Sequence, residues 1–134
     1  MTFFVHGIAV PKGSVKAFIP KGWNRAVLTS ASGPKLKDWN RSIAVAALEA
    51  RGQSPVTAEA VAVDLIFYLP RPKAAKKRVH CTVRPDVDKL CRAVLDPMIG
   101  IVFEDDSQVV RLAVQKQYIS DTIPPGVQVT VEIL

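Results

Sequence analysis

The chain has 134 residues, of which 49% are hydrophobic, and a formal net charge of +6. That length suits one domain, which buries roughly two thirds of its unfolded surface without a disulfide or a metal. The apolar content excludes a disordered chain, and no apolar run approaches the roughly 20 residues that span a bilayer. The start, MTFFVHGIAVPKG, lacks a basic region and a cleavage site typical of secretory signals, so we expect a cytoplasmic protein.

The first predicted elements are short strands and one helix. FFVHGIAV (3–10) is apolar and β-branched, and further strands around 15–19 and 26–30 would form an opening meander. A helical pattern of about four turns then starts at Pro34 and closes at Gly52. Its buried stripe recurs at three- and four-residue steps and comprises Leu36, Trp39, Ile43, Ala46, Ala47 and Ala50.

In residues 59–69 apolar side chains recur at every second position, which predicts a strand. One face carries Val61, Val63, Leu65, Phe67 and Leu69. The other face carries Ala62, Ile66 and Tyr68, so we expect a central strand that is covered on both sides. An exposed loop (70–85) with three prolines follows, and its cations are Arg71, Lys73, Lys76, Lys77, Arg78 and Arg84.

A second helix is expected after this loop, with Asp86 as its N-cap residue and Pro97 ending or kinking it near Asp96. Its apolar stripe comprises Leu90, Cys91, Val94, Leu95 and Met98. Two alternating strands close the chain, at 108–118 and 126–134, with a hairpin-type connection through the PPG sequence between them. The residues expected to point inward are Val110, Leu112, Val114, Val127, Val129, Val131 and Ile133. The pattern predicts a single α/β (mixed α+β) domain over 1–134, in which a mixed β-sheet packs with two main helices.

Half of the chain's 12 acids fall in the stretch RPDVDKLCRAVLDPMIGIVFEDDSQVV (84–110), although the protein as a whole is basic. They are Asp86, Asp88, Asp96, Glu104, Asp105 and Asp106. Five of these acids, all but Glu104, have a structural interpretation. Asp86 can cap the helix, Asp88 can complement its dipole, Asp96 can pair with Arg92, and the last pair can shape a turn.

The alternative is a metal site. Carboxylates that converge from separate elements repel one another unless a cation compensates, and Mg²⁺ prefers oxygen ligands from one or two carboxylates plus substrate phosphates. Such an ion activates water and neutralises charge on a phosphodiester. The two cysteines, Cys81 and Cys91, do not form a zinc site with His6 or His80, and we expect them to be reduced structural thiols.

The stretch resembles the core pattern of the RusA-type Holliday junction resolvases, a family found in prophages and bacteriophages. The shared features are P-D-x-D, a helix that carries L-D, and a D-D-S-Q-V strand entry. GIAVPKGSVKAF near the start and the final alternating strands are similar in order and placement. The resemblance implies a RusA-like fold and a homodimeric, Mg²⁺-dependent endodeoxyribonuclease, in which Mn²⁺ can substitute, that nicks two strands of a four-way DNA junction.

The resemblance also implies residue roles. Asp86, Asp88 and Asp106 would bind the metal and act in catalysis, and Asp96 and Asp105 would support them. Arg92 falls where the family has a catalytic lysine. Because arginine keeps the charge but does not shuttle a proton as a lysine of lowered pKa does, electrostatic stabilisation is the role it can retain.

We expect DNA backbone contacts from the basic loop and the helix start, which would make binding salt dependent. These cations are Arg71, Lys73, Lys76, Lys77, Arg78, Arg84 and Lys89. Two alternatives stay open at this point. One is a nuclease of the same chemistry that acts on flaps, forks or single strands, and the other is a basic DNA-binding protein without catalysis.

Overall fold

The computed structural model describes residues 1–13, 15–30, 33–75 and 77–134. Two helices, two short 3₁₀ helices and six strands follow one another along this described part of the chain. Their bounds in chain order are β1 Thr2–His6, β2 Val15–Phe18, β3 Val27–Ser30, α1 Pro34–Arg51, β4 Val61–Leu69, η1 Lys73–Ala75, α2 Val87–Met98, η2 Asp106–Gln108, β5 Val109–Tyr118 and β6 Gly126–Ile133.

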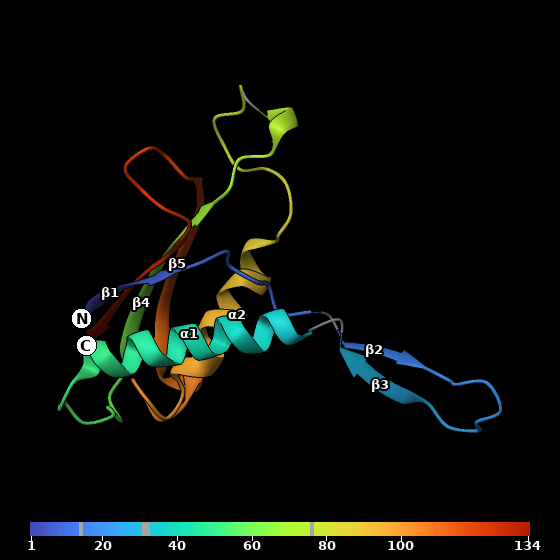
Figure 1. Ribbon diagram of the computed structural model, residues 1–134. Coiled ribbons are helices and arrows are strands. Elements are labelled where there is room, and N and C mark those ends of the chain that lie inside the picture. Colours follow the sequence, from blue (N-terminus) through green and yellow to red (C-terminus); the bar gives the residue numbers. More distant parts are fainter. Residues whose placement is uncertain (14, 31–32, 76) are drawn as a thin grey trace.

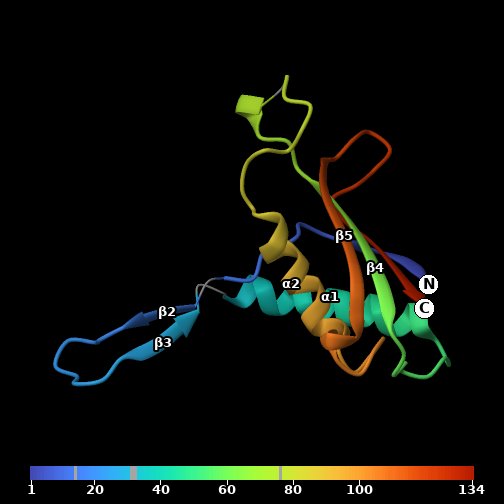
Figure 2. The same cartoon turned by 180° about the vertical axis from the view of Figure 1, so that it is seen from behind.

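The main sheet has four strands in the order β1-β6-β4-β5. β4 runs parallel to β5 and antiparallel to β6, and β1 runs antiparallel to β6, so the sheet is mixed. Both helices pack on one side of this sheet (Figures 1 and 2). The expected mixed α+β fold with two main helices is therefore confirmed. β2 and β3 pair only with each other and form a separate hairpin rather than part of a meander.

The core lies between the helices and the sheet. α1 begins with Pro34 in its first turn and buries Leu36, Trp39, Ile43 and Ala47 from the predicted stripe. Phe67 of β4 and Leu90 of α2 are fully buried in the same core. Burying a side chain of this size contributes about 1.5–3 kcal/mol, so Phe67→Ala would cost about 3–5 kcal/mol through the cavity that it leaves.

Among the described residues no helix lies over the far face of the sheet, so the expectation of a central β4 covered on both sides is confirmed only in part, with Ala62 and Tyr68 buried. Asp64 is exposed and Ile66 is only partly buried. Tyr68 is buried without a helix above it because Phe4 of β1 stacks beside it, with 6.1 Å between the ring centroids. Where this face is buried, it is therefore covered by side chains of neighbouring strands.

β5 lies at the edge of the sheet, and this position overturns part of the predicted inward set. Val110 is 64% exposed at a register irregularity opposite the start of β4, and Leu112 is 43% exposed. An edge strand has a neighbour on one side only, so its apolar side chains are less covered than those of β4. Ile133, at the end of β6, is also exposed, whereas Val127, Val129 and Val131 are buried as expected.

The connection from β5 to β6 is not a hairpin, because β4 lies between these strands. The chain therefore crosses the end of β4 at 119–125. Two boundaries also differ from the expected ones. β1 ends at His6 instead of continuing to residue 10, and α2 continues through Pro97 to Met98, where the Ile99 N–H donates to the Asp96 carbonyl.

β4, α2 and β5 form a parallel strand–helix–strand unit. In such a unit the helix starts near the carboxyl ends of both strands, which is where open α/β sheets bind their ligands. The amino end of α2 and the basic loop before it therefore share one end of the sheet. In the described part of the chain, no helix is long and apolar enough to cross a membrane.

Candidate active site

Asp86 and Asp88 stand at the start of α2. Asp86 is the N-cap residue with extended backbone, as predicted, but its side chain makes no capping hydrogen bond. Asp88 is exposed in the first turn, and no hydrogen bond or ion pair joins its carboxylate to another described residue. Neither carboxylate is therefore used to hold the helix start together, and both lie where the helix dipole favours negative charge.

Two cations of α2 lie close to these acids. Lys89 Nζ is 3.8 Å from Asp86 Oδ2, with the side chains 41% and 56% exposed, so this ion pair stabilises little and can open. Arg92 is exposed one turn after Asp88, and its guanidinium has no ion-pair partner in the described part of the chain. Arg92 is therefore available to contact an anion.

Cys91 lies on the buried side of the same turn. Burial and then the charge of Asp88 raise the pKa of its thiol to about 11. Because only the thiolate is a good nucleophile or metal ligand, this cysteine is inert at neutral pH. Cys81 and Cys91 are both free and buried, as expected of structural thiols.

Lys116 is a site residue that the sequence analysis missed. It comes from the carboxyl-terminal half of β5, and its Nζ donates to the carbonyls of Val83 at 2.8 Å and Pro85 at 2.9 Å. The ammonium thereby fastens the end of the basic loop to the sheet directly before Asp86. A signal for it was present, because the β5 alternation puts this cation on the same face as Leu112 and Val114.

Asp105 and Asp106 stand at the other end of β5 and differ in role. Asp105 caps η2: its carboxylate accepts hydrogen bonds from the Ser107 hydroxyl and N–H, while Gln108 completes a capping box. The hydrogen bonds from Ser107 lower the pKa of Asp105. Asp106 is exposed and makes no such contact with the described residues. The turn-shaping role thus falls to Asp105 alone.

Asp96 lies in the last turns of α2 and pairs with Lys12, with 2.8 Å between Nζ and Oδ2, instead of with Arg92. The Lys12 N–H also donates to the Lys89 carbonyl at 3.1 Å. These two contacts tie the segment after β1 to α2. Asp96 therefore has a structural role.

One chain does not bring the acids of the motif together. Lys116, which marks the Asp86 end of β5, is seven residues from Val109, and a strand covers that separation in about 23 Å. Asp106 precedes Val109, so it lies farther still. Among the described residues no three His, Cys, Asp or Glu side chains gather into a group that could hold a metal ion. The convergence expected from the sequence is therefore not found within one chain.

The residues at the start of α2 nevertheless fit half of a metal site. Asp86 and Asp88 offer exposed carboxylate oxygens without structural hydrogen bonds. Such oxygens suit Mg²⁺, which needs only one or two carboxylates when phosphate oxygens and water complete its shell. Asp106 offers one more unengaged carboxylate at the opposite end of β5.

The basic loop before α2 is exposed, as predicted, at Lys73, Lys77, Arg78 and Arg84. Lys76 lies outside the described residues. Arg71 is partly engaged, because its guanidinium stacks 4.2 Å from the centre of the Tyr118 ring and donates to the Arg78 carbonyl. Arg71 thus ties the start of the loop to the end of β5, and the remaining cations lie in the segment that leads into Asp86 and Asp88.

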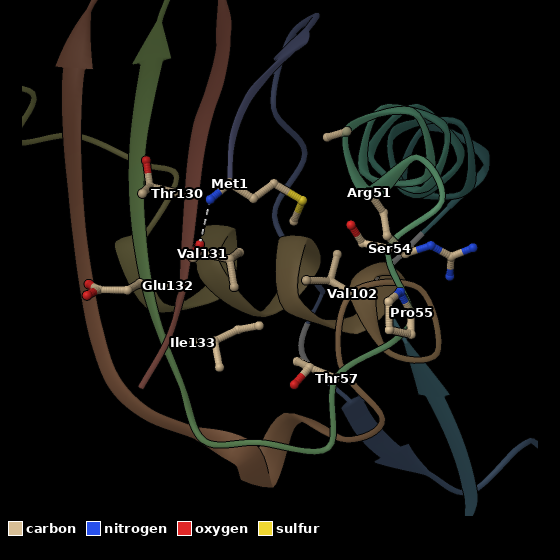
Figure 3. A pocket seen from close by; sticks show the side chains of 11 residues that line it. Met1, Arg51, Ser54, Pro55, Thr57, Val102, Thr130, Val131, Glu132 and Ile133 are labelled. Atoms are coloured by element: carbon tan, nitrogen blue, oxygen red, sulfur yellow. Dashed lines mark hydrogen bonds between the residues drawn. The ribbon is translucent and has the colours of Figure 1, made fainter.

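A cavity of about 520 Å³ lies elsewhere, and its lining is mostly apolar. It is formed between the end of α1 and the end of β6, with Val102, Val131 and Ile133 around it (Figure 3). The guanidinium of Arg51 and the carboxylate of Glu132 point away from its centre (Figure 3). The open surface at the start of α2, rather than this cavity, is the candidate active site.

Comparisons with known proteins identify the family of the chain. The family described as Endodeoxyribonuclease RusA matches residues 12–132, which include both ends of the acidic motif. A protein of Bacillus subtilis (strain 168), "Uncharacterized protein YqaN", is 30% identical over 127 residues, which cover 87% of this chain and 86% of that protein. The family implies endodeoxyribonuclease activity. With the acidic motif, the basic loop and nearly the whole length matched, the chain belongs to the RusA endodeoxyribonuclease family.

Proposed function

We propose that this protein is a Mg²⁺-dependent endodeoxyribonuclease that resolves Holliday junctions by paired symmetric nicks and works as a homodimer. One observation carries the proposal. The three aspartates of the motif whose side chains make no hydrogen bond, Asp86, Asp88 and Asp106, stand at opposite ends of the edge strand β5.

The edge position of β5 explains how two chains would complete the site. Its outer edge has no strand partner among the described residues, and it exposes Val110 and Leu112. A long exposed edge of this kind pairs readily with another strand. If two copies of β5 pair antiparallel about a two-fold axis, the amino end of one lies beside the carboxyl end of the other. Asp106 of one chain would then approach Asp86 and Asp88 of its partner.

In this arrangement each composite site would hold Mg²⁺ with Asp86 and Asp88 from one chain and Asp106 from the other. The ion supplies activation of water and neutralisation of charge at a phosphodiester. Arg92, one turn into α2, would contact the phosphate and stabilise the negative charge that develops on it. Lys116 would keep the helix start in place through the Val83 and Pro85 carbonyls.

The cations of the basic loop would follow the DNA backbone on either side of the cut. Exposed Lys73, Lys77, Arg78 and Arg84 lie just before the acids in sequence and supply affinity without reading bases. Lys89 would join them once its weak pair with Asp86 opens. Two such sites related by a two-fold axis suit a four-way junction, whose paired cuts are related in the same way.

A basic DNA-binding protein without catalysis is the weaker alternative. Three exposed carboxylates that hold no part of the fold would oppose DNA phosphates and lower the affinity of a protein that only binds. A nuclease that cuts flaps or forks remains a distinct alternative, because the site chemistry would be the same. Substrate choice therefore needs a direct assay.

The test is cleavage of a mobile synthetic four-way junction, beside duplex, flap and single-stranded controls, in Mg²⁺ or EDTA. We expect wild type to make paired symmetric nicks only with Mg²⁺, and Asp88→Asn and Asp106→Asn to lose them while still binding DNA. Asp64→Asn is the matched control, because this exposed acid lies on the far face of the sheet and should be dispensable for cutting. Junction binding without cutting in Mg²⁺ or Mn²⁺ would refute the nuclease, and preferred cutting of flaps would favour that alternative.

A further inference from the structure

The β2–β3 hairpin extends away from the sheet and the helices in both views (Figures 1 and 2). Its tip, residues 19–26, exposes Ile19 at 65% and Trp23 at 52%. Such exposed side chains at the end of an arm add nothing to a core. From the tip structure we infer that Trp23 binds an unstacked base at the branch point of the DNA junction, an inference that rests on the proposed function.

The tip is a defined turn. The Trp23 N–H donates to the Pro20 carbonyl at 3.0 Å, and Gly22 between them has φ +85°. This backbone conformation, with glycine at the third position, is that of a type II turn, which other residues adopt only with strain. The turn therefore fixes the backbone from which the indole projects before any ligand arrives, which lowers the entropic cost of binding.

The indole also has the electrostatic surroundings that a nucleic-acid ligand requires. The Arg25 guanidinium lies 5.7 Å from the centre of the Trp23 ring, and Lys21 is exposed in the turn itself. The first 37 residues contain six Lys or Arg and no Asp or Glu. An aromatic platform flanked by cations is the arrangement that binds bases by stacking and the backbone by charge.

The root of the arm is fastened to the proposed catalytic helix. The Lys12 N–H donates to the Lys89 carbonyl, next to Asp88, and its Nζ donates to Asp96, about two turns farther along α2. From Lys12 to Lys21 an extended chain reaches about 30 Å. The tip therefore operates on the same DNA as the acids but away from the cut. At a branch point the helical stack is interrupted, and a base is exposed there at less cost than in continuous duplex.

The test measures binding in EDTA, where the proposed nuclease does not cut. Wild type, Trp23→Ala and Trp23→Phe are titrated with a four-way junction and with duplex of the same arm sequence. The junction carries 2-aminopurine either at the branch point or in the middle of an arm. Leu48→Ala, at an exposed position on α1, is the control for a general loss of apolar surface, and emission from buried Trp39 reports that each variant is folded.

We expect Trp23→Ala to weaken junction binding about 5- to 150-fold, as loss of one stacked base predicts. Duplex binding should change less than about twofold, because the backbone contacts that supply nonspecific affinity remain. Trp23→Phe should retain most of the junction affinity. The 2-aminopurine signal should change on binding only at the branch point and only when residue 23 is aromatic.

The inference would be overturned if Trp23→Ala weakened junction and duplex binding equally, or weakened neither. It would also be overturned if wild type bound the junction no more tightly than duplex. Cleavage is assayed separately in Mg²⁺ with wild type and Trp23→Ala. A junction that is bound with Trp23-dependent preference but never cut would contradict the proposed nuclease while the tip proposal stands. A junction that is cut without dependence on Trp23 would contradict only the tip.

Discussion

Mixed dimers give the sharpest prediction about the proposed site. Let one chain carry Asp88→Asn and the other Asp106→Asn, each with its own affinity tag, and purify the mixed dimer through both tags after co-expression. If each site combines the helix start of one chain with Asp106 of the other, both substitutions fall in one site and the second site is intact. Two inactive chains would then form a dimer with about half of the wild-type sites.

The structure sets the size of this effect. Within one chain the two ends of β5 are separated by about 23 Å of strand, whereas Mg²⁺ contacts its ligands at about 2.1 Å. Asp106 therefore cannot reach a metal ion bound at the helix start of its own chain. Each site of the mixed dimer should accordingly be either fully active or inactive. We expect the mixed dimer to nick one junction strand at about half the wild-type rate per dimer and to lose paired nicking.

The assay is a time course with a four-way junction labelled on one strand at a time, so that single and paired cuts are separated. The matched control is a mixed dimer of Asp86→Asn with Asp88→Asn, in which each site keeps one damaged helix start and no activity should return. An inactive dimer of Asp88→Asn with Asp106→Asn, at normal stability and DNA affinity, would refute the composite site.

Three further predictions concern neighbouring residues. Lys116→Met removes two charge-assisted hydrogen bonds and should lower the free energy of unfolding by about 1–3 kcal/mol in urea titrations, and junction cutting should fall more than DNA binding. Asp105→Asn should keep most activity, unlike Asp106→Asn. Because hydrogen bonds from Ser107 lower the pKa of Asp105, its stabilising effect is present above the ordinary value of 3.8 and is lost as the pH falls through the lowered pKa, so acid titrations of wild type and Asp105→Asn should converge. Lys77→Gln should reduce the slope of log affinity against log salt by about one for junction and duplex alike, and an unchanged slope would remove this lysine from the DNA contact surface.

Local patterns predicted most elements correctly, because they depend on neighbours within about four residues along the chain. The stripe of α1, the alternation of β4 and the N-cap position of Asp86 are all of this kind. Strand order is a different matter, because it depends on contacts between distant segments. The alternation that includes Val110 and Leu112 predicts a strand, but it does not predict that this strand lies at the edge of the sheet or that β4 separates it from β6.

The separation of the acids, in contrast, could have been predicted from the sequence. A strand, a helix and a strand in succession favour a parallel unit with a crossover helix. In that unit the start of the helix and the start of the next strand lie at opposite ends of the sheet. Asp86 and Asp106 occupy those two starts. A shared motif therefore does not imply a shared location within one chain.

The separation has a consequence for control of cutting under the proposed arrangement. A single chain carries two acids at one end of β5 and one at the other, so it cannot complete a site alone, and cutting requires the two-fold pairing that also suits a four-way junction. The same exposed edge would supply affinity between chains and place the third carboxylate. Substitutions that disrupt β5 pairing, such as Leu112→Lys at the edge, should therefore abolish cutting without touching an acid. Monomeric Leu112→Lys that still makes Mg²⁺-dependent nicks would show that each chain holds a complete site.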